Sequence, residues 1–286
     1  MNPLDHPFEV VNVSAEEGIA ALPAASVDCI VTSPPYWNLR DYGDNRQLGH
    51  EETPEHFINN LFGLFGLALS KLKDTGSIWV NLGDTYIDGE AQMIPQRFAN
   101  EMRSLYTLKN TIIWYKPDAM AESVQNRFSQ KWEPFFWFVK SEDFYFNPDA
   151  LSIPVTKSFA ERLEYKFNTS EEDVSRMRGL VGDASEKIEH YLQRGVNAGD
   201  VWIIPKDKDK TGHPAPWPVA LAARPIVATC PPDGVVYDPF AGSGQTGIAV
   251  HRCGAGRKFI GTDVTPEWAE LGNRRIKEER AQMELF

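Results

Sequence analysis

The chain has 286 residues, of which 42% are hydrophobic and 24% charged, with a formal net charge of −11 at pH 7. This length and composition fit a soluble protein with one large domain, or one domain with an insert. No signal peptide and no membrane span are expected, because the N-terminus lacks a basic-then-apolar stretch and no run of about 18 apolar residues exists. Three widely spaced cysteines (Cys29, Cys230 and Cys253) form no metal-type pair or disulfide framework, which fits a reducing cytoplasm.

The acidic balance argues mildly against a nucleic-acid partner, because binding to phosphates favours Lys and Arg. The charge is unevenly distributed, however. Residues 97–140 carry a net charge of +3 and residues 201–286 carry +1, whereas residues 1–96 carry −10. A basic strip on an acidic body is therefore still compatible with DNA binding.

The first half of the chain predicts strands alternating with helices. Residues 7–22 read as a short strand and an amphipathic helix, with Ser14 as N-cap and Glu17 three residues later. Helical spacing of apolar residues, and Pro54 in the first turn, predict a helix over 54–72. The other predicted elements are strands at 28–32, 76–82, 110–115 and 134–139, a loop at 38–53 and a helix at 94–105.

The second half begins with a change of character. Residues 141–200 are polar and acidic, with helical patches near 158–166, 170–179 and 184–193, and are interpreted as an insert. A loop over 205–218 follows. Then come a helix at 219–229, a strand at 234–238, a helix at 244–252, a strand at 257–262 and a helix at 266–281. The predicted strands do not alternate strictly between apolar and polar residues, and they are interleaved with helices. This pattern predicts a mostly parallel, doubly wound sheet covered on both faces.

A glycine-rich turn follows the strand at 234–238. Gly242-Ser243-Gly244-Gln245-Thr246-Gly247 matches G-x-G-x-x-G, and Asp263 ends the next strand, 21 residues after Gly242, where an acid can accept hydrogen bonds from ribose hydroxyls. NAD would place a pyrophosphate at the helix N-terminus, where Asp238 would repel it. S-adenosylmethionine carries cationic groups and no phosphate, so Asp238 favours that cofactor.

A second segment, Ser33-Pro34-Pro35-Tyr36, follows the strand at 28–32. Two prolines fix the backbone and remove two N–H donors, which leaves a rigid ledge of carbonyl acceptors. The Ser33 hydroxyl and the Pro34 carbonyl suit an exocyclic NH2 group, and Tyr36 can stack on a flipped base. Two acceptors localise the lone pair of an aromatic amine, so that it can attack a sulfonium methyl group without a metal or a covalent intermediate. Rigid placement lowers the entropic barrier.

The two segments together resemble the amino-group DNA methyltransferases of the permuted type, in which the catalytic motif precedes the cofactor motif. Thr32 to Tyr36 is similar to the catalytic motif, and Asp238-Pro239-Phe240-Ala241-Gly242-Ser243-Gly244 is similar to the S-adenosylmethionine motif. Ile260 to Asp263 resembles the ribose-binding strand, and His213 to Pro218 the segment that closes over the methionine end of the cofactor. The resemblance departs at Gln245, where Thr is usual, and in the strand at 9–13, which lacks a Gly-Asp pair.

The resemblance implies a Rossmann-like, S-adenosylmethionine-dependent methyltransferase fold. Residues 1–140 and 201–286 would form the catalytic and cofactor-binding domain, and 141–200 a target-recognition insert. Double-stranded DNA is the expected partner. A homodimer, a cognate restriction endonuclease, and the cytoplasm of a prokaryotic or phage-infected cell are further expectations. Candidate residues for a DNA-binding basic face are Arg127, Lys131, Arg162, Lys166, Arg176 and Arg178.

The methylated atom is either cytosine N4 or adenine N6. Carbon-5 of cytosine is rejected, because in that family the nucleophilic Cys follows a Pro, and none of the three cysteines does. In the family a Ser before Pro-Pro-Tyr resembles the cytosine-N4 group and an Asp the adenine-N6 group, so Ser33 favours cytosine-N4. Two other classes are alternatives: an NAD-dependent oxidoreductase, which leaves Ser33 to Trp37 unexplained, and a non-catalytic nucleic-acid-binding module.

Overall fold

The computed structural model describes residues 7–283 except 42, 45, 121, 155–192, 208–211 and 213–215. The chain divides into two compact units, Met1–Phe146 with Asp200–Phe286, and Asn147–Gly199. The described part of the smaller unit contains a short 3-10 helix, η2 (Pro148–Leu151), a bridge between Ile153 and Val196, and a 2.6 Å ion pair between Arg194 and Asp149. The proposed helices between 158 and 192 lie outside the described residues.

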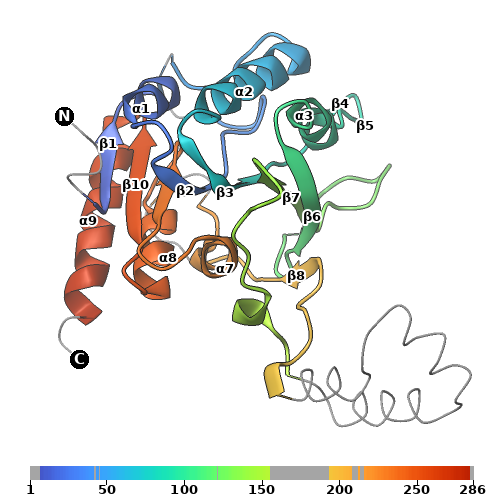
Figure 1. The fold of residues 1–286 in the computed structure, drawn as a ribbon. Coiled ribbons are helices and arrows are strands. Elements are labelled where there is room, and N and C mark those ends of the chain that lie inside the picture. The colour runs from blue at the N-terminus through green and yellow to red at the C-terminus, as the bar shows by residue number, and fades with distance from the viewer. Residues whose placement is uncertain are drawn as a thin grey trace, which may run out of the picture. The chain divides into compact units, whose positions relative to one another are not determined.

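The larger unit is built on an eight-stranded sheet in the order β1-β10-β9-β2-β3-β7-β6-β8 (Figure 1). All neighbouring pairs are parallel except those that β7 makes with β3 and β6. The mostly parallel, doubly wound sheet is thus confirmed. The strand bounds are β1 Glu9–Asn12, β2 Val27–Thr32, β3 Leu72–Asn81, β6 Thr107–Tyr115, β7 Trp132–Val139, β8 Val201–Ile203, β9 Val235–Asp238 and β10 Lys258–Asp263.

Helices α1 (Ala15–Ala21), α2 (Pro54–Ala68) and α3 (Ile94–Met102) form one layer against the sheet (Figure 1). The predicted capping box is present at α1, where Ser14 Oγ accepts from the Glu17 N–H and Glu17 accepts from the Ser14 N–H. The apolar stripe of α2 packs into a cluster that includes strand residues Ile30 and Ile78. Burial of these apolar side chains is the main force that holds this layer on the sheet.

Helices α7 (Val219–Thr229), α8 (Gln245–Cys253) and α9 (Pro266–Met283) form the layer on the opposite face (Figure 1). Along β3, Ile78 points to the α2 layer, whereas the indole N–H of Trp79 donates to Thr229 of α7 over 3.0 Å. Trp79 also stacks on Trp137 and Trp202 at ring-centroid distances of 5.3 and 5.9 Å. Aromatic packing therefore fills the core under α7.

The central neighbours β2 and β9 send the chain to opposite faces of the sheet. After β2 the chain enters α2 on one face, and after β9 it enters α8 on the other. This is the switch point at which open α/β sheets form a crevice at the carboxyl ends of their strands.

Some boundaries differ from those that the sequence predicts. Leu72 continues the helical spacing of α2, but the helix ends at Ala68 and Leu72 begins β3, paired with Val27. The edge strand β8 and the small hairpin of β4 (Tyr86–Ile87) and β5 (Glu90–Ala91) were not predicted. Within the described ranges, no helix is both long and apolar enough to cross a lipid bilayer.

Candidate active site

A cavity of about 480 Å³ opens at the carboxyl ends of β2, β3, β9 and β10. The segment after β2 contributes Ser33, Pro34, Pro35 and Tyr36 to its wall. The segment after β9 contributes Pro239, Phe240, Ala241, Gly242 and Ser243, and Asp263 comes from the end of β10. The fold therefore brings the two sequence motifs, some two hundred residues apart, into one cavity.

Ser33 begins the wall at the end of β2. Its hydroxyl lies 3.4 Å from Oδ1 of Asn81, the last residue of β3. The Asn81 amide is fully buried, and its Nδ2 donates to the Pro134 carbonyl over 3.1 Å. That bond fixes the orientation of the amide, so the oxygen of Asn81 faces Ser33. No local pattern signals this pairing, because Asn81 sits in an ordinary buried strand.

Tyr36 is held by a polar network beneath the cavity. Its hydroxyl lies 2.9 Å from Asn81 Oδ1 and 2.9 Å from Glu133 Oε2, and its one proton can be donated to either. Glu133 forms an ion pair with Lys116, with side chains only 13% and 10% exposed. All four residues line the cavity. Lys116 and Glu133 were missed by sequence reasoning, since nothing local marks them as partners across β6 and β7.

The aromatic ring of Tyr36 packs closely against Gly83. A Cβ atom on Gly83 would lie only 2.6 Å from Tyr36 Cδ2. Gly83 follows β3 closely, so the absence of a side chain there lets the ring settle against the backbone. Trp37, the next aromatic, is buried in the core, where its indole N–H donates to the Glu51 carbonyl over 2.8 Å.

The glycine loop after β9 turns tightly into α8. Gly244 adopts a φ of 81°, which only glycine adopts readily, and a Cβ there would lie 2.9 Å from the Gly272 carbonyl oxygen. Gly244 does not line the cavity, whereas Gly242 and Ser243 do. The Ser243 carbonyl accepts from Arg275 over 2.7 Å, which ties the loop to α9.

Asp238 lies behind the glycine loop and not in the cavity wall. Its carboxylate accepts from the Thr32 hydroxyl at 2.6 Å, the Thr246 hydroxyl at 2.5 Å and the Phe240 N–H at 3.0 Å. Burial raises the pKa of Asp238 to about 6, although these three hydrogen bonds oppose the shift. From the sequence, this carboxylate is expected near the cationic groups of a cofactor. In the structure it binds the protein's own loops.

Asp263 is the carboxylate that does line the cavity. Its Oδ2 accepts from the Gly242 N–H at 2.9 Å and its Oδ1 from the Thr265 N–H at 2.9 Å. Burial raises the pKa of Asp263, and the backbone hydrogen bonds from Thr265 and Gly242 act against it. Each oxygen retains a further lone pair, so the group can accept additional hydrogen bonds from a ligand.

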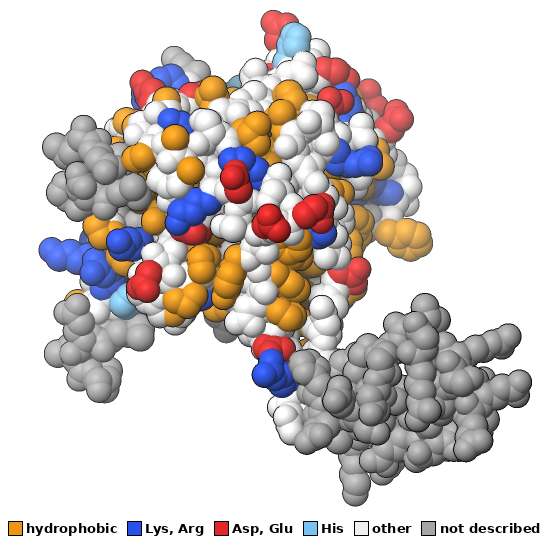
Figure 2. Space-filling model, in the orientation of Figure 1, with side chains coloured by type: hydrophobic (Ala, Val, Ile, Leu, Met, Phe, Trp, Pro, Cys, Tyr) orange, Lys and Arg blue, Asp and Glu red, His pale blue; other side chains and the backbone are white. Residues whose placement is uncertain are grey.

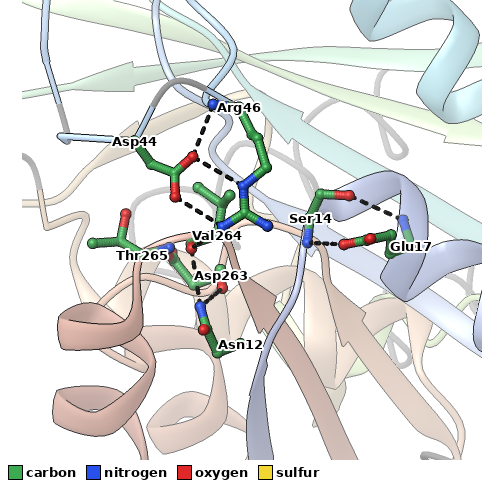
Figure 3. A network of polar contacts seen from close by, with 8 residues as sticks. All are labelled: Asn12, Ser14, Glu17, Asp44, Arg46, Asp263, Val264 and Thr265. Carbon is green, nitrogen blue, oxygen red and sulfur yellow. Dashed lines mark hydrogen bonds and ion pairs between the residues drawn. The ribbon is translucent and has the colours of Figure 1, made fainter.

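The loop over 38–53 crosses to the end of β10 (Figure 3). Arg46 pairs with Asp44 at 2.8 Å and donates to the Val264 carbonyl at 3.3 Å, and both Arg46 and Val264 line the cavity. From β1, Asn12 donates to the carbonyls of Asp263 and Val264, each over 2.9 Å (Figure 3). The sequence predicted only a polar loop here, because contacts between distant segments leave no local pattern.

The segment expected to close over the cofactor is described in part. Residues 213–215 lie outside the described residues, whereas Pro216 and Trp217 line the cavity. Trp217 is buried and packs edge-on against Phe135 of β7, with ring centroids 5.7 Å apart. The described end of this segment is thus fixed to the sheet.

The expected basic face is engaged within the protein where the structure describes it. Arg127 pairs with Glu122 at 2.7 Å, and Lys131 donates to the Ala119 carbonyl at 2.7 Å. Arg162, Lys166, Arg176 and Arg178 lie outside the described residues. On the face drawn in Figure 2, Lys and Arg side chains are intermixed with Asp and Glu, and hydrophobic side chains are exposed between them.

The cavity offers a specific chemistry. One end carries oxygen acceptors from Ser33, Asn81 and Tyr36, and the other carries the backbone of a glycine loop and the Asp263 carboxylate. The three thiols stand outside it: burial raises the pKa values of Cys29, Cys230 and Cys253, so all three stay protonated near neutral pH. The arrangement can hold an amine at one end and a nucleoside ligand at the other.

Comparison with known proteins places the chain in a family. The N6/N4 methyltransferase family, described as DNA methylase, matches residues 27–274. The chain is 29% identical to Type II methyltransferase M.Cfr9I of Citrobacter freundii, over 96% of this chain and 90% of that protein.

Solved structures share the fold. PvuII DNA methyltransferase (cytosine-N4-specific) superposes with a TM-score of 0.65 at 17% identity, covering 97% of this chain and 94% of that one. Protein TTHA0409 of Thermus thermophilus, in complex with S-adenosyl-L-methionine, superposes with a TM-score of 0.59 at 26% identity, covering 96% of each chain.

Proposed function

We propose that this chain, which belongs to the N6/N4 DNA methylase family, transfers a methyl group to the exocyclic N4 amine of a cytosine flipped out of duplex DNA. The enzyme is an S-adenosylmethionine-dependent DNA methyltransferase. The choice of atom and the roles of individual residues are our proposal. The observation that carries them is the shared cavity, which both Ser33 and the glycine loop at Gly242 line.

The wall around Gly242 fits the cofactor. Ser243 is 2% exposed and lines the cavity, and its buried hydroxyl has no hydrogen-bond partner among the residues that the structure describes. A buried hydroxyl without a partner is unfavourable, so a ligand that bonds to it is stabilised. We assign Asp263 to the ribose hydroxyls and the loop from Pro239 to Ser243, with Phe240 beside it, to the remainder of the nucleoside. When bound, S-adenosylmethionine supplies a methyl group activated by a sulfonium centre.

The residues after β2 and β3 hold the nucleophile. With its hydroxyl proton directed at Asn81 Oδ1, Ser33 keeps its lone pairs for an amine N–H. The Pro34 carbonyl is the second acceptor. Two acceptors on one amine favour a pyramidal nitrogen with a localised lone pair. Because Ser33, Asn81 and Tyr36 are linked by hydrogen bonds, the pocket is organised before the base enters it, which lowers the entropic barrier.

Ser33 supports cytosine over adenine. A Ser before Pro-Pro-Tyr resembles the cytosine-N4 group of the family, whereas an Asp at that position resembles the adenine-N6 group. Adenine N6 is the alternative, because the matched family spans both atoms and adenine also presents an amine beside a ring nitrogen.

The test is expression of the chain in a host free of DNA modification, followed by digestion of genomic DNA and nucleoside mass spectrometry. N4-methylcytosine is expected, at sites that modification-aware sequencing then defines. A Ser33→Ala variant, expressed equally, provides the background. N6-methyladenine would overturn the choice of atom, and no modified base would overturn the methyl-transfer activity.

We further propose that residues 141–200 read the DNA sequence. Their separation is supported by the compact unit Asn147–Gly199. Alanine substitution of the pair Arg176 and Arg178 is expected to weaken binding to the specific site more than cofactor binding. If affinity for specific DNA stays unchanged, these two residues do not contact it.

Two partners follow from the same proposal. Light scattering after size exclusion tests the expected homodimer, and a monomer at all concentrations would exclude it. The expected restriction endonuclease would cleave the site that this enzyme methylates. Genomic DNA carrying the modification should resist cleavage by such an endonuclease, whereas DNA from the Ser33→Ala strain should be cut. Cleavage of both DNAs would contradict this expectation.

A further inference from the structure

A loop between β6 and β7 emerges beside the cavity. It runs from Lys116 to Lys131, joined at its base by a 2.8 Å hydrogen bond from the Lys116 N–H to the Lys131 carbonyl. Since β7 is antiparallel to both β3 and β6, the end of β6 and the end of β3 lie at the same edge of the sheet. Lys116 and Gln130, at the two ends of the loop, line the cavity. The loop is therefore part of the cavity rim.

The loop is held in a defined shape by its own polar groups. Glu122 accepts from the Gln130 N–H at 2.9 Å and pairs with Arg127 at 2.7 Å. The Arg127 guanidinium lies 3.9 Å from the centre of the Tyr86 ring, which fastens the loop to the β4–β5 hairpin. These contacts occupy the charged side chains of Arg127 and Glu122, so they are not what the loop presents to a partner.

The loop presents hydrophobic side chains instead. Phe128 is 97% exposed and Met120 is 85% exposed, the highest values among the large hydrophobic residues that the structure describes. Phe128 and Met120 together place exposed apolar surface on the rim of the cavity, where a ligand of the cavity can contact it. Phe128 is two residues from Gln130, so its backbone lies within about 7 Å of a residue of the cavity wall.

We propose that Phe128 is a wedge that inserts into the DNA duplex at the position that the target base leaves. This inference rests on the proposed function, in which the cavity receives an extruded base. Extrusion leaves a gap in the stack and two neighbouring bases without a stacking partner. An apolar side chain inserted there replaces the lost stacking, as aromatic and aliphatic wedges do in other DNA complexes. The Arg127 ring contact and the Glu122 pair hold the loop that carries it.

The experiment compares two duplexes that contain the methylation site. In one the target base is paired, and in the other it faces an abasic site, so that extrusion costs less. Phe128→Ala is expected to lower kcat/KM on the paired duplex by about ten- to a hundredfold, which is the usual effect of losing one base–aromatic stack. On the abasic duplex the same variant should approach the wild-type rate. Phe128→Trp should restore activity on the paired duplex.

Leu67→Ala is the matched control, because Leu67 is a half-exposed hydrophobic residue on α2 that does not line the cavity. It should leave both rates unchanged. A fluorescent base analogue at the target position reports extrusion without methyl transfer, and its signal should fall in Phe128→Ala.

Equal losses on both duplexes, unchanged rates, or unchanged fluorescence would overturn the wedge. So would a change of oligomeric state in Phe128→Ala with normal extrusion. Methylation of adenine by the wild type would overturn the choice of atom alone, since the comparison of duplexes does not depend on which base is extruded.

Discussion

The hydroxyl of Thr32 lies 2.6 Å from Oδ1 of Asp238, so the last residue of β2 is bonded to the last residue of β9. One strand leads into Ser33 and the other into the glycine loop. Because Asp238 also accepts from Thr246 and from the Phe240 N–H, a single buried carboxylate fixes the spacing between the Ser33 segment and the glycine loop.

Asp238→Asn is expected to change how stability depends on pH. Burial raises the pKa of Asp238 to about 6 in the folded state, against about 3.9 in an unfolded chain. The folded state therefore binds this proton more tightly than the unfolded chain does. The contribution of the protonated carboxyl to the free energy of unfolding is lost as pH rises from about 4 to about 6. A shift of about two pKa units corresponds to about 3 kcal/mol.

The asparagine variant has no such proton to lose. Its free energy of unfolding relative to wild type should rise by about 3 kcal/mol between pH 4 and pH 7. Urea unfolding monitored by fluorescence across this range measures the difference. Asp143→Asn, at an exposed position, should follow the wild-type profile. Parallel curves for Asp238→Asn and wild type would show that Asp238 does not titrate in this window.

Ser33→Ala should reduce methyl transfer without affecting the cofactor. Loss of one preorganised polar group at a reacting centre usually lowers kcat by about 10²–10³. The dissociation constant for S-adenosylmethionine should stay near wild type, because Ser33 lies at the other end of the cavity from Asp263. Single-turnover kinetics and calorimetry separate the two effects. Ser104→Ala, which removes an exposed hydroxyl, is the control, and wild-type turnover in Ser33→Ala would remove Ser33 from the amine site.

Asp263→Ala should weaken cofactor binding. Hydrogen bonds to a charged group contribute about 1.5–3 kcal/mol, which is about a ten- to hundredfold rise in the dissociation constant. Gly242 and Thr265 also lose their acceptor, so the loop is less ordered as well. Calorimetry without DNA measures the constant. Asp74→Ala, which removes an exposed carboxylate paired with Lys140, should bind normally. An unchanged constant for Asp263→Ala would exclude the ribose role.

Gly83→Ala should displace the Tyr36 ring and lower kcat. The added Cβ would lie 2.6 Å from Tyr36 Cδ2, so the ring must move within the cavity wall. Displacement by about 1 Å can lower kcat by about a hundredfold. Gly63→Ala is the matched control. Its Cβ would point into open space on α2, and it should stabilise the helix by about 0.5–1 kcal/mol with unchanged kcat. Equal kcat values for the two variants would show that Tyr36 tolerates displacement.

Lys116→Met should destabilise the fold, because it leaves the largely buried carboxylate of Glu133 without its cationic partner. Breaking such a pair usually costs about 3–5 kcal/mol. The double variant Lys116→Met/Glu133→Gln should recover most of the free energy of unfolding measured in urea. Its kcat should stay low, since Tyr36 has lost the Glu133 carboxylate as a partner. A double variant less stable than Lys116→Met would contradict this.

Local patterns predicted the sheet and both motif loops well. The strand, turn and helix at 235–253 could be predicted because apolar runs, glycines and helical spacing all occur within twenty residues. The predicted end of α2 was wrong, because an apolar residue at position 72 fits both the helical spacing and the start of a buried strand. The three-residue strand β8 is too short to give a pattern, and its place depends on pairing with Ile113.

The cavity was predicted only where it is local in sequence. Ser33, Gly242 and Asp263 lie in recognisable segments, and their functional roles remain predictions to be tested. Asn81, Lys116 and Glu133 come from three different parts of the sheet, and only the register of β3, β6 and β7 brings them together. The position of Asp238 behind the loop could not be predicted either, because a sequence shows that an acid ends a strand but not which way it points.

The fixed amide of Asn81 has a consequence for bases other than the target. Since Nδ2 is bonded to Pro134, the group that Asn81 turns toward Ser33 is an oxygen. Because the Ser33 proton is directed at that oxygen, Ser33 turns lone pairs toward the base, and a thymine in the same pose would set its O4 carbonyl against them. The pocket is thus expected to reject bases with a carbonyl at this position by electrostatic repulsion and not by a steric clash.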